Sequence, residues 1–329
     1  MSRGDRCFRF MVTGALLCIV LLVFVGAVVR ATGAGLGCPD WPKCWGQLVP
    51  PWKVEQVDLD KIDYERFEKK AKRLGRDPES VTPENILKSF NPVHTWTEFI
   101  NRLFALPVAL FSLGAVVSSF FVSRRFPRVR MQMLAGAILF IVLLNAFLGA
   151  MVVWSGLKPG MISLHLALAF LLIFVTTYCR RVVSEDEPWE EGRTLRSWIW
   201  ALLGLVMLEG IMGSQVRELT DSLAKSHLGE LRKSWIVELE RSVIYLVHRS
   251  FSWLIVVLMA VVAWKVGRLG IFEKRAITMT ILVGAMMVMG LILAQVSVFP
   301  LVQILHVGAA ALMVVVLCDW SLVLNQARK

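Results

Sequence analysis

Residues 10–29, which read FMVTGALLCIVLLVFVGAVV, decide the fold class of this chain. The stretch carries no charged side chain, and about 20 consecutive apolar residues are what a helix needs to cross a bilayer. Comparable stretches recur at residues 103–122, 131–153, 161–179, 198–212, 243–264, 276–296 and 301–324. We therefore predict an all-α membrane protein with eight transmembrane helices, of which the fifth is short and carries Glu209.

The composition indicates a lipid environment and excludes a nucleic-acid-binding protein. The 329 residues are 56% hydrophobic and 19% charged, whereas soluble domains average roughly 45–50% and about 25%. The net charge of +11 comes from Lys and Arg in short clusters between apolar stretches, a distribution that reports membrane topology. The partner that this pattern indicates is membrane lipid.

The basic clusters predict that both termini lie in the cytoplasm. They occur before the first apolar stretch, after the second, fourth and sixth, and in the tail, and they include Arg124, Arg125, Arg328 and Lys329. Two large outer loops follow, residues 31–93, with ten basic and ten acidic side chains, and residues 213–242. We expect no cleavable signal peptide, because the first apolar stretch is too long for one.

The second half of the chain repeats the pattern of the first. Both halves contain four apolar stretches in the same orientation, which predicts a parallel repeat about an axis along the membrane normal. We expect two tandem, pseudo-symmetric four-helix bundles, residues 1–190 with outer loop 31–93 and residues 191–329 with outer loop 213–242. The matching positions are Arg30 with Arg217, Asn101-Arg102 with His248-Arg249, and His165 with His306.

Three of the five histidines, His165, His248 and His306, lie in apolar stretches at a similar depth below the outer face. A polar side chain at that depth is costly and indicates a functional site. Imidazoles on facing helices of a bundle suit axial ligation of a haem iron. Zinc fits less well, because we expect no acidic or Cys side chain at this level. The alternative is that each His makes a structural hydrogen bond between helices.

Arginines beside these positions are candidate partners for haem propionates, since Arg binds carboxylates in a bidentate manner. The alternative for each is that it extends to the membrane interface and serves no ligand. The candidates are Arg30, Arg102, Arg217 and Arg249.

Five segments then carry a resemblance to a known family. They are GAVVRATGAGLGCPDWPKCWG at 26–46, HTWTEFINRL at 94–103, HLALAF at 165–170, LVHRSF at 246–251 and LVQILHVG at 301–308. In these segments and in their order the sequence resembles the haem A synthases of bacterial plasma membranes and mitochondria.

The resemblance implies an oxidoreductase that converts haem O to haem A, by oxidising the C8 methyl group of the porphyrin to a formyl group for terminal oxidase assembly. It implies a haem b cofactor bound by His248 and His306, and substrate haem O bound in the first half with His165 as an iron ligand. It assigns the catalytic role, as a general base or a stabiliser of positive charge, to Glu98. A Glu at this place also stabilises the positive end of a helix.

The resemblance also implies a location and candidate partners. It places the chain in the bacterial plasma membrane as a multi-pass protein, with its sites toward the outer face. The candidate partners are haem O synthase, oxidase assembly proteins and a second copy of this chain.

The sequence departs from the family at Asn101. The common pattern there is Glu-x-x-His-Arg, and this chain reads Glu98-Phe-Ile-Asn101-Arg102. Three interpretations follow. We favour binding of the substrate iron by His165 alone, because Glu98 is retained. A second is that His94 substitutes, although it lies roughly 10 Å from Asn101 along a helix axis. The third is that the activity has been lost.

Cys38 and Cys44 lie in an outer, oxidising compartment, which favours a disulfide between them. We interpret this disulfide as a staple rather than a redox relay. The outer loops also contain two predicted amphipathic helices, DYERFEKKAKRLG at 63–75 and ELRKSWIVELERS at 230–242, and a surface histidine, His227. The remaining cysteines are expected to be inert apolar residues. They are Cys7, Cys18, Cys179 and Cys318.

Rival functions remain open. A di-haem b-type electron carrier would use His248 and His306, but it has no need of Glu98 or of the GLGCPDWPKC segment. A haem-holding oxidase assembly factor would suit a substrate site with one histidine. A transporter is less well supported, because transporter sites are built from broken helices near the midplane.

Overall fold

The structure is a computed structural model that describes residues 2–73, 77–123, 126–158, 160–184, 191–227, 229–270 and 273–324. Within these ranges the chain is helical and contains no strand, and eight helices are long and apolar enough to cross a membrane. The predicted all-α fold and the predicted number of spans are therefore confirmed. Arg124, Arg125, Arg328 and Lys329, which contributed to the predicted orientation, lie outside the described residues.

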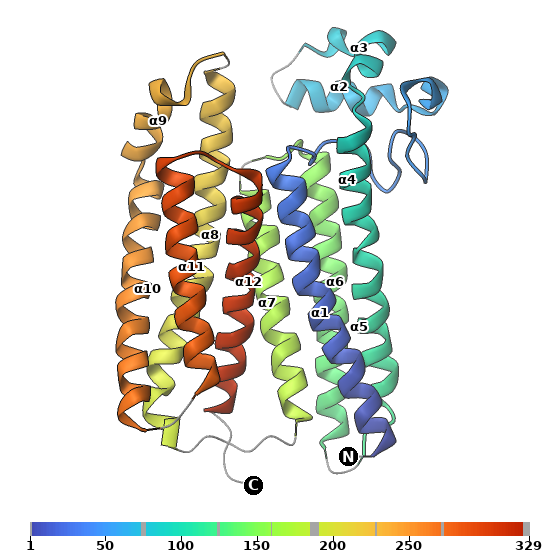
Figure 1. Cartoon of the computed structure of the whole chain (residues 1–329). Helices are drawn as coiled ribbons and strands as arrows, with labels where there is room; N and C mark the ends of the chain where they lie inside the picture. The colour runs from blue at the N-terminus through green and yellow to red at the C-terminus, as the bar shows by residue number, and fades with distance from the viewer. Residues whose placement is uncertain are drawn as a thin grey trace.

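The spans are α1 (Arg3–Ala31), α4 with α5 (Pro92–Leu103 and Ala105–Ser119), α6 (Arg128–Trp154), α7 (Met161–Val182), α8 (Arg196–Ser226), α10 (Val243–Arg268), α11 (Lys274–Gln295) and α12 (Pro300–Val323). Helix α1 begins and α12 ends at the same end of the molecule (Figure 1). The opposite end, which carries the extra-membrane helices, is called the outer end below. Placement of both termini in the cytoplasm stays a prediction.

Two predicted boundaries were wrong. The fifth span does not end at residue 212, because α8 continues as a helix to Ser226. Its polar continuation contacts a neighbouring helix and a loop. Asp221 pairs with Arg30 of α1 at 2.7 Å, and Glu218 accepts the N–H of Gly160, in the loop before α7, at 2.8 Å. The second span starts earlier than residue 103, because the Asn91 side chain caps α4 by accepting the His94 N–H.

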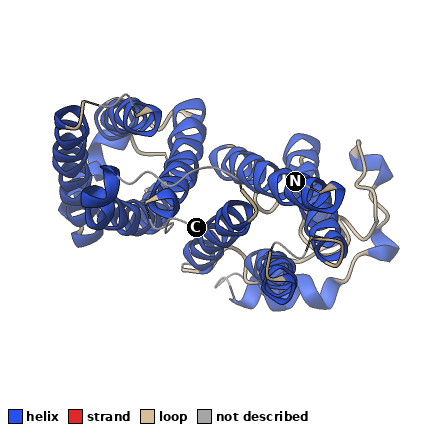
Figure 2. Ribbon diagram, turned by 90° about the horizontal axis from the view of Figure 1, so that it is seen from below, coloured by secondary structure: helices blue, strands red, loops and turns tan. Residues whose placement is uncertain are grey.

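The spans form two rings of four, seen along their axes as two groups in Figure 2. In the first ring, α1 and α6 each contact both the α4–α5 span and α7. In the second, α8 and α11 each contact both α10 and α12. The rings adjoin through α12, which contacts α1 and α7, and through α7 against α8. The pseudo-symmetry of the halves and the boundary at 190/191 stay predictions.

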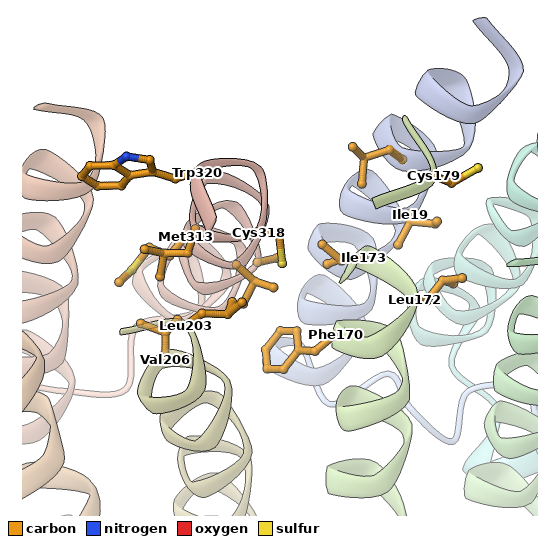
Figure 3. Packing of buried hydrophobic residues seen from close by; sticks show 14 of the residues in the cluster. Ile19, Phe170, Leu172, Ile173, Cys179, Leu203, Val206, Met313, Cys318 and Trp320 are labelled. Carbon is orange, nitrogen blue, oxygen red and sulfur yellow. The ribbon is translucent and has the colours of Figure 1, made fainter. Parts of the chain in front are cut away.

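One apolar core runs through both rings and across the contact between them. Figure 3 shows the Phe170 ring of α7 pointing toward α8, which carries Leu203 and Val206, and all three side chains are buried. A Cβ added to Gly210 of α8 would lie 2.7 Å from the Phe170 ring, so the missing side chain permits this close contact. The interface is therefore shaped by close packing rather than by apolar character alone.

A partly buried ionic cluster joins the rings at the end opposite the outer end. Asp319 of α12 pairs with Arg181 of α7 at 2.5 Å and with Arg275 of α11 at 3.0 Å. Arg180 of α7 adds a third contact, 2.8 Å from the same carboxylate. Buried charges are retained only when they are paired, so one aspartate here aligns helices from both halves.

Short helices cover the outer end in Figure 1. They are η1 (Val54–Gln56), η2 (Leu59–Lys61), α2 (Tyr64–Arg73), η3 (Pro78–Ser80), α3 (Pro83–Ser89) and α9 (Arg232–Arg241). A further short helix, η4 (Glu191–Leu195), precedes α8 at the opposite end. Helices α2 and α9 confirm the two amphipathic helices predicted in the outer loops. Residues of the first loop form a small core of their own around the buried Cys38, Cys44 and Trp45.

Candidate functional site

Each of the four predicted ligand positions lies beside a glycine of a neighbouring helix. The pairs are Asn101 with Gly26, His165 with Gly149, His248 with Gly213 and His306 with Gly290. A Cβ atom added to these glycines would lie 3.9, 3.4, 3.2 and 3.7 Å from the partner side chain, in that order. The four positions therefore share one local environment, and Asn101 occupies the same kind of place as the histidines.

In each ring, the two candidate ligand positions lie on diagonally opposite helices, called opposite corners below. His248 lies on α10 and His306 on α12, which are separated by α8 and α11. Asn101 on α4 and His165 on α7 are separated in the same way by α1 and α6. A flat ligand held between opposite corners would fit this arrangement in each ring.

Several polar atoms at these positions are buried and have no hydrogen-bond partner within the described ranges. They are Oδ1 of Asn101 and Nδ1 of His165, His248 and His306. Interhelical hydrogen bonding, the structural alternative for the histidines, has a candidate partner at His248, whose Nδ1 atom lies 3.0 Å from Oε1 of Glu209 on α8. Buried polar groups without partners are uncommon in proteins. Four of the thirteen such side-chain atoms among the described residues lie at these positions, which supports a functional site there.

Glu98 is buried, with 3% of its surface exposed, and is held at both oxygens. Its Oε2 atom accepts the Cys38 N–H at 2.8 Å, and its Oε1 atom accepts from Arg102 at 2.5 Å. Its place is one turn of α4 from Asn101 toward the outer end. A carboxylate bound in this way is a fixed negative charge at the edge of the first ring.

The loop that holds Glu98 is closed by a disulfide between Cys38 and Cys44, which confirms the predicted pair. Further contacts order it independently of the cross-link. Asp40 accepts the backbone N–H groups of Trp45 and Gly46 at 2.7 and 2.9 Å. The Trp45 indole donates to Thr95 of α4 at 3.0 Å. The loop is thereby docked on the helix that carries Glu98.

The four candidate propionate arginines have different surroundings. Arg30 and Arg217 both pair with Asp221, each at 2.7 Å, so arginines from the two halves share one carboxylate. Arg102 donates to Glu98 and to the carbonyl oxygens of the disulfide loop. Arg249 is exposed. Their role toward propionates stays a prediction.

The other two histidines lie away from these positions. His94 is in the first turn of α4, where its backbone carbonyl would be 2.3 Å from a Cβ added to Gly37 of the loop. His227 ends α8, and its Nε2 atom lies 3.4 Å from Glu238 of α9.

Glu209 corrects the expectation that no acidic side chain lies at the level of the histidines. Its Oε1 atom lies 3.0 Å from Nδ1 of His248. The sequence contains a signal for this contact, because Glu209 is a lone acid in an apolar stretch, one turn before Gly213. Glu209 entered the sequence-based prediction only as a feature of the fifth span. Asp221 was also missed, because it falls where a loop was predicted.

Comparison with known proteins places these features in a family. A family model described as cytochrome oxidase assembly protein matches residues 9–318. Heme A synthase of Shewanella oneidensis is 28% identical over 210 residues, which are 61% of this chain and 55% of that protein. Heme A synthase of Bartonella tribocorum is 26% identical over 212 residues, covering 62% and 56%. For heme A synthase of Listeria welshimeri the values are 25% over 262 residues, 77% and 73%. The alignments with the first two relatives thus span just over half of their length.

Proposed function

This chain belongs to the family of cytochrome oxidase assembly proteins, and we propose that it is a haem A synthase of the bacterial plasma membrane. Its substrate is haem O, whose C8 methyl group it oxidises to the formyl group of haem A. The observation that carries this proposal is the buried Glu98 held at the edge of a ring whose opposite corners are His165 and Asn101. Relatives named heme A synthase support the same activity.

The second ring fits a haem b cofactor. Two imidazoles on opposite corners, each beside a glycine, match the bis-histidine ligation of b-type haems. His248 and His306 would hold the iron, and the bound haem would supply one-electron transfer. An electron carrier alone would leave the buried network of Glu98, Arg102 and the disulfide loop without a purpose.

In the first ring we propose that His165 holds the iron of haem O and that Asn101 faces it from the opposite corner. Asn is a poor iron ligand, so this side remains open. His94 is a weak substitute, because α4 is helical between residues 94 and 101 and separates them by roughly 10 Å. The open side is where an oxidant of the methyl group can be accommodated.

We propose that Glu98 acts on the methyl carbon as a fixed anion. Its two oxygens already accept from Cys38 and Arg102, which orients the carboxylate before substrate binds. Preorganised charges act most strongly in a site that excludes water. Glu98 would stabilise positive charge that develops when the methyl carbon is oxidised, and it would orient the water that supplies oxygen.

The test is to express the chain in a host that makes haem O but no haem A, and to identify the extracted haems by mass. Haem A or its hydroxylated intermediate is expected from the wild type and not from Glu98→Gln. The matched control is Glu84→Gln, which removes an exposed, ion-paired glutamate from α3. Unchanged haem O in the presence of well-expressed wild-type protein would overturn the proposal and favour a haem-holding assembly factor.

A further inference from the structure

Glu209 is a buried acid with unusual surroundings. It lies within the apolar part of α8, with 8% of its surface exposed, where an ionisable side chain is costly. Its Oε1 atom accepts a hydrogen bond from Ser252 of α10, while its Oε2 atom is buried and has no partner in the described part of the chain. Among the ion pairs of the described residues, no arginine or lysine pairs with Glu209, so its role is not that of a structural salt bridge.

The neighbour of Glu209 is the imidazole of His248. The distance from Oε1 to Nδ1 is 3.0 Å, although the ring's N–H direction is out of line with the oxygen, so the hydrogen bond is not formed in this rotamer. The hydrogen bond forms only if the ring rotates until its Nδ1–H points at Oε1. Ser252 lies one turn after His248, and its hydroxyl has both Oε1 of Glu209 and, at 3.0 Å, the His248 carbonyl oxygen as acceptors for its single proton, which sets Glu209 beside the ring.

This arrangement is confined to the second half. The repeat pairs Gly213 with Gly26 and His248 with Asn101. The residue four positions before Gly26 is Leu22, where the second half has Glu209. The residue four positions after Asn101 is Ala105, where the second half has Ser252. The acid and its hydroxyl partner therefore serve the His248–His306 pair and not the fold that the two halves share.

We propose that Glu209 is a positioning residue that accepts the Nδ1–H of His248 and sets the reduction potential of the iron bound there. This inference rests on the proposed haem b site. Accepting that proton fixes the tautomer that leaves Nε2 free for the iron. A carboxylate acceptor also makes the imidazole a stronger donor, which favours the oxidised iron and lowers its reduction potential.

The experiment is a redox titration of the haem bound to the full-length purified protein, followed by its visible absorption. In Glu209→Gln the neutral amide replaces the anion. We expect the ratio of reduced to oxidised haem at a fixed potential to rise about tenfold, which is ~59 mV for one electron. A role limited to joining α8 and α10 would change the thermal stability without moving this ratio.

The matched control is Glu218→Gln on the same helix. The Glu218 carboxylate accepts the N–H of Gly160, in the loop between α6 and α7, and has no hydrogen bond or ion pair with His248. It should leave the ratio unchanged. A Glu209→Gln protein with full haem content and the wild-type ratio overturns the inference, as does an equal shift in Glu218→Gln.

Three outcomes need separate treatment. If Glu209→Gln does not accumulate, Ser252→Ala carries the test: Oε1 then serves His248 alone, the ratio should fall, and an unchanged ratio overturns the inference. If wild-type protein shows no low-spin, six-coordinate haem, both the inference and the proposed ligand pair are overturned. If the haem titrates as expected but haem O is not converted, only the proposed enzymatic activity fails.

Discussion

The backbone N–H of Cys38 donates a hydrogen bond to the Glu98 carboxylate at 2.8 Å, across 60 residues of sequence. Arg102, one turn further along α4, binds the other oxygen of Glu98 and the Cys38 carbonyl oxygen. The loop, the acid and the arginine thus form one unit. Changes to the loop should therefore affect the chemistry assigned to Glu98 without affecting the second ring.

Gly37→Ala tests this unit. The added Cβ would lie 2.3 Å from the backbone carbonyl oxygen of His94, a contact that side-chain motion cannot relieve. The loop must move away from α4, and Glu98 loses the Cys38 N–H. A hydrogen bond to a charged group contributes about 1.5–3 kcal/mol, so we expect haem O conversion to fall at least about tenfold. Haem b content should stay at the wild-type level.

The matched control for this variant is Gly136→Ala in α6, where nothing lies within 4 Å of the new atom. Conversion is measured as haem A formed per protein in the haem O host. If Gly37→Ala converts haem O as fast as Gly136→Ala, docking of the loop is not needed to hold Glu98.

The glycines beside the histidines predict a graded series. A Cβ at Gly213 would lie 3.2 Å from the His248 ring, which is tight, whereas a Cβ at Gly290 would lie 3.7 Å from His306, an ordinary contact. Gly213→Ala should therefore displace its ring by a few tenths of an ångström and lower the haem retained per protein. Gly290→Ala should resemble wild type. Equal haem loss in the two variants would show that contact distance is not the cause.

Asn101→His should restore a second imidazole to the first ring. We expect the iron of bound haem O to change to a six-coordinate, low-spin spectrum, because imidazole is a far better ligand than an amide. Conversion should fall, because this chain, unlike family members that carry His at this position, is proposed to use the open side. Faster conversion in Asn101→His would contradict the open-side interpretation and identify Asn101 as a weakened ligand position.

Asp319→Asn should destabilise the joint between the halves. Three arginines would lose their shared carboxylate. Removing one partner of a fully buried pair costs about 3–5 kcal/mol, so we expect a smaller loss for this partly buried cluster. Thermal unfolding in detergent measures this as a lower midpoint. The control is Glu65→Gln, which removes an exposed ion pair with Lys69 and should change the midpoint little. Equal midpoints for the two variants would show that the cluster contributes no net stability.

Local sequence determined the spans and where along them the candidate ligand positions lie. An apolar stretch of about 20 residues has one stable conformation in lipid, because only a helix satisfies its backbone there. His165, His248 and His306 then acquire similar depths from their distances to the helix ends. The disulfide pair and the two amphipathic helices of the outer loops were also predictable, since their signals lie within a few residues of each other.

Contacts between distant segments were decided only by the tertiary structure. Glu98 meets Cys38, Glu209 meets His248, and Asp221 joins Arg30 to Arg217 because packed helices bring these side chains together. The α8 boundary was missed for the same reason, since its polar residues remain helical by pairing with α1 and the α6–α7 loop. The position of a residue along its span gives the depth of its side chain, and helical periodicity gives the face of the helix on which it lies. Which neighbour it meets depends on the packing of whole helices, and no local stretch of sequence encodes that.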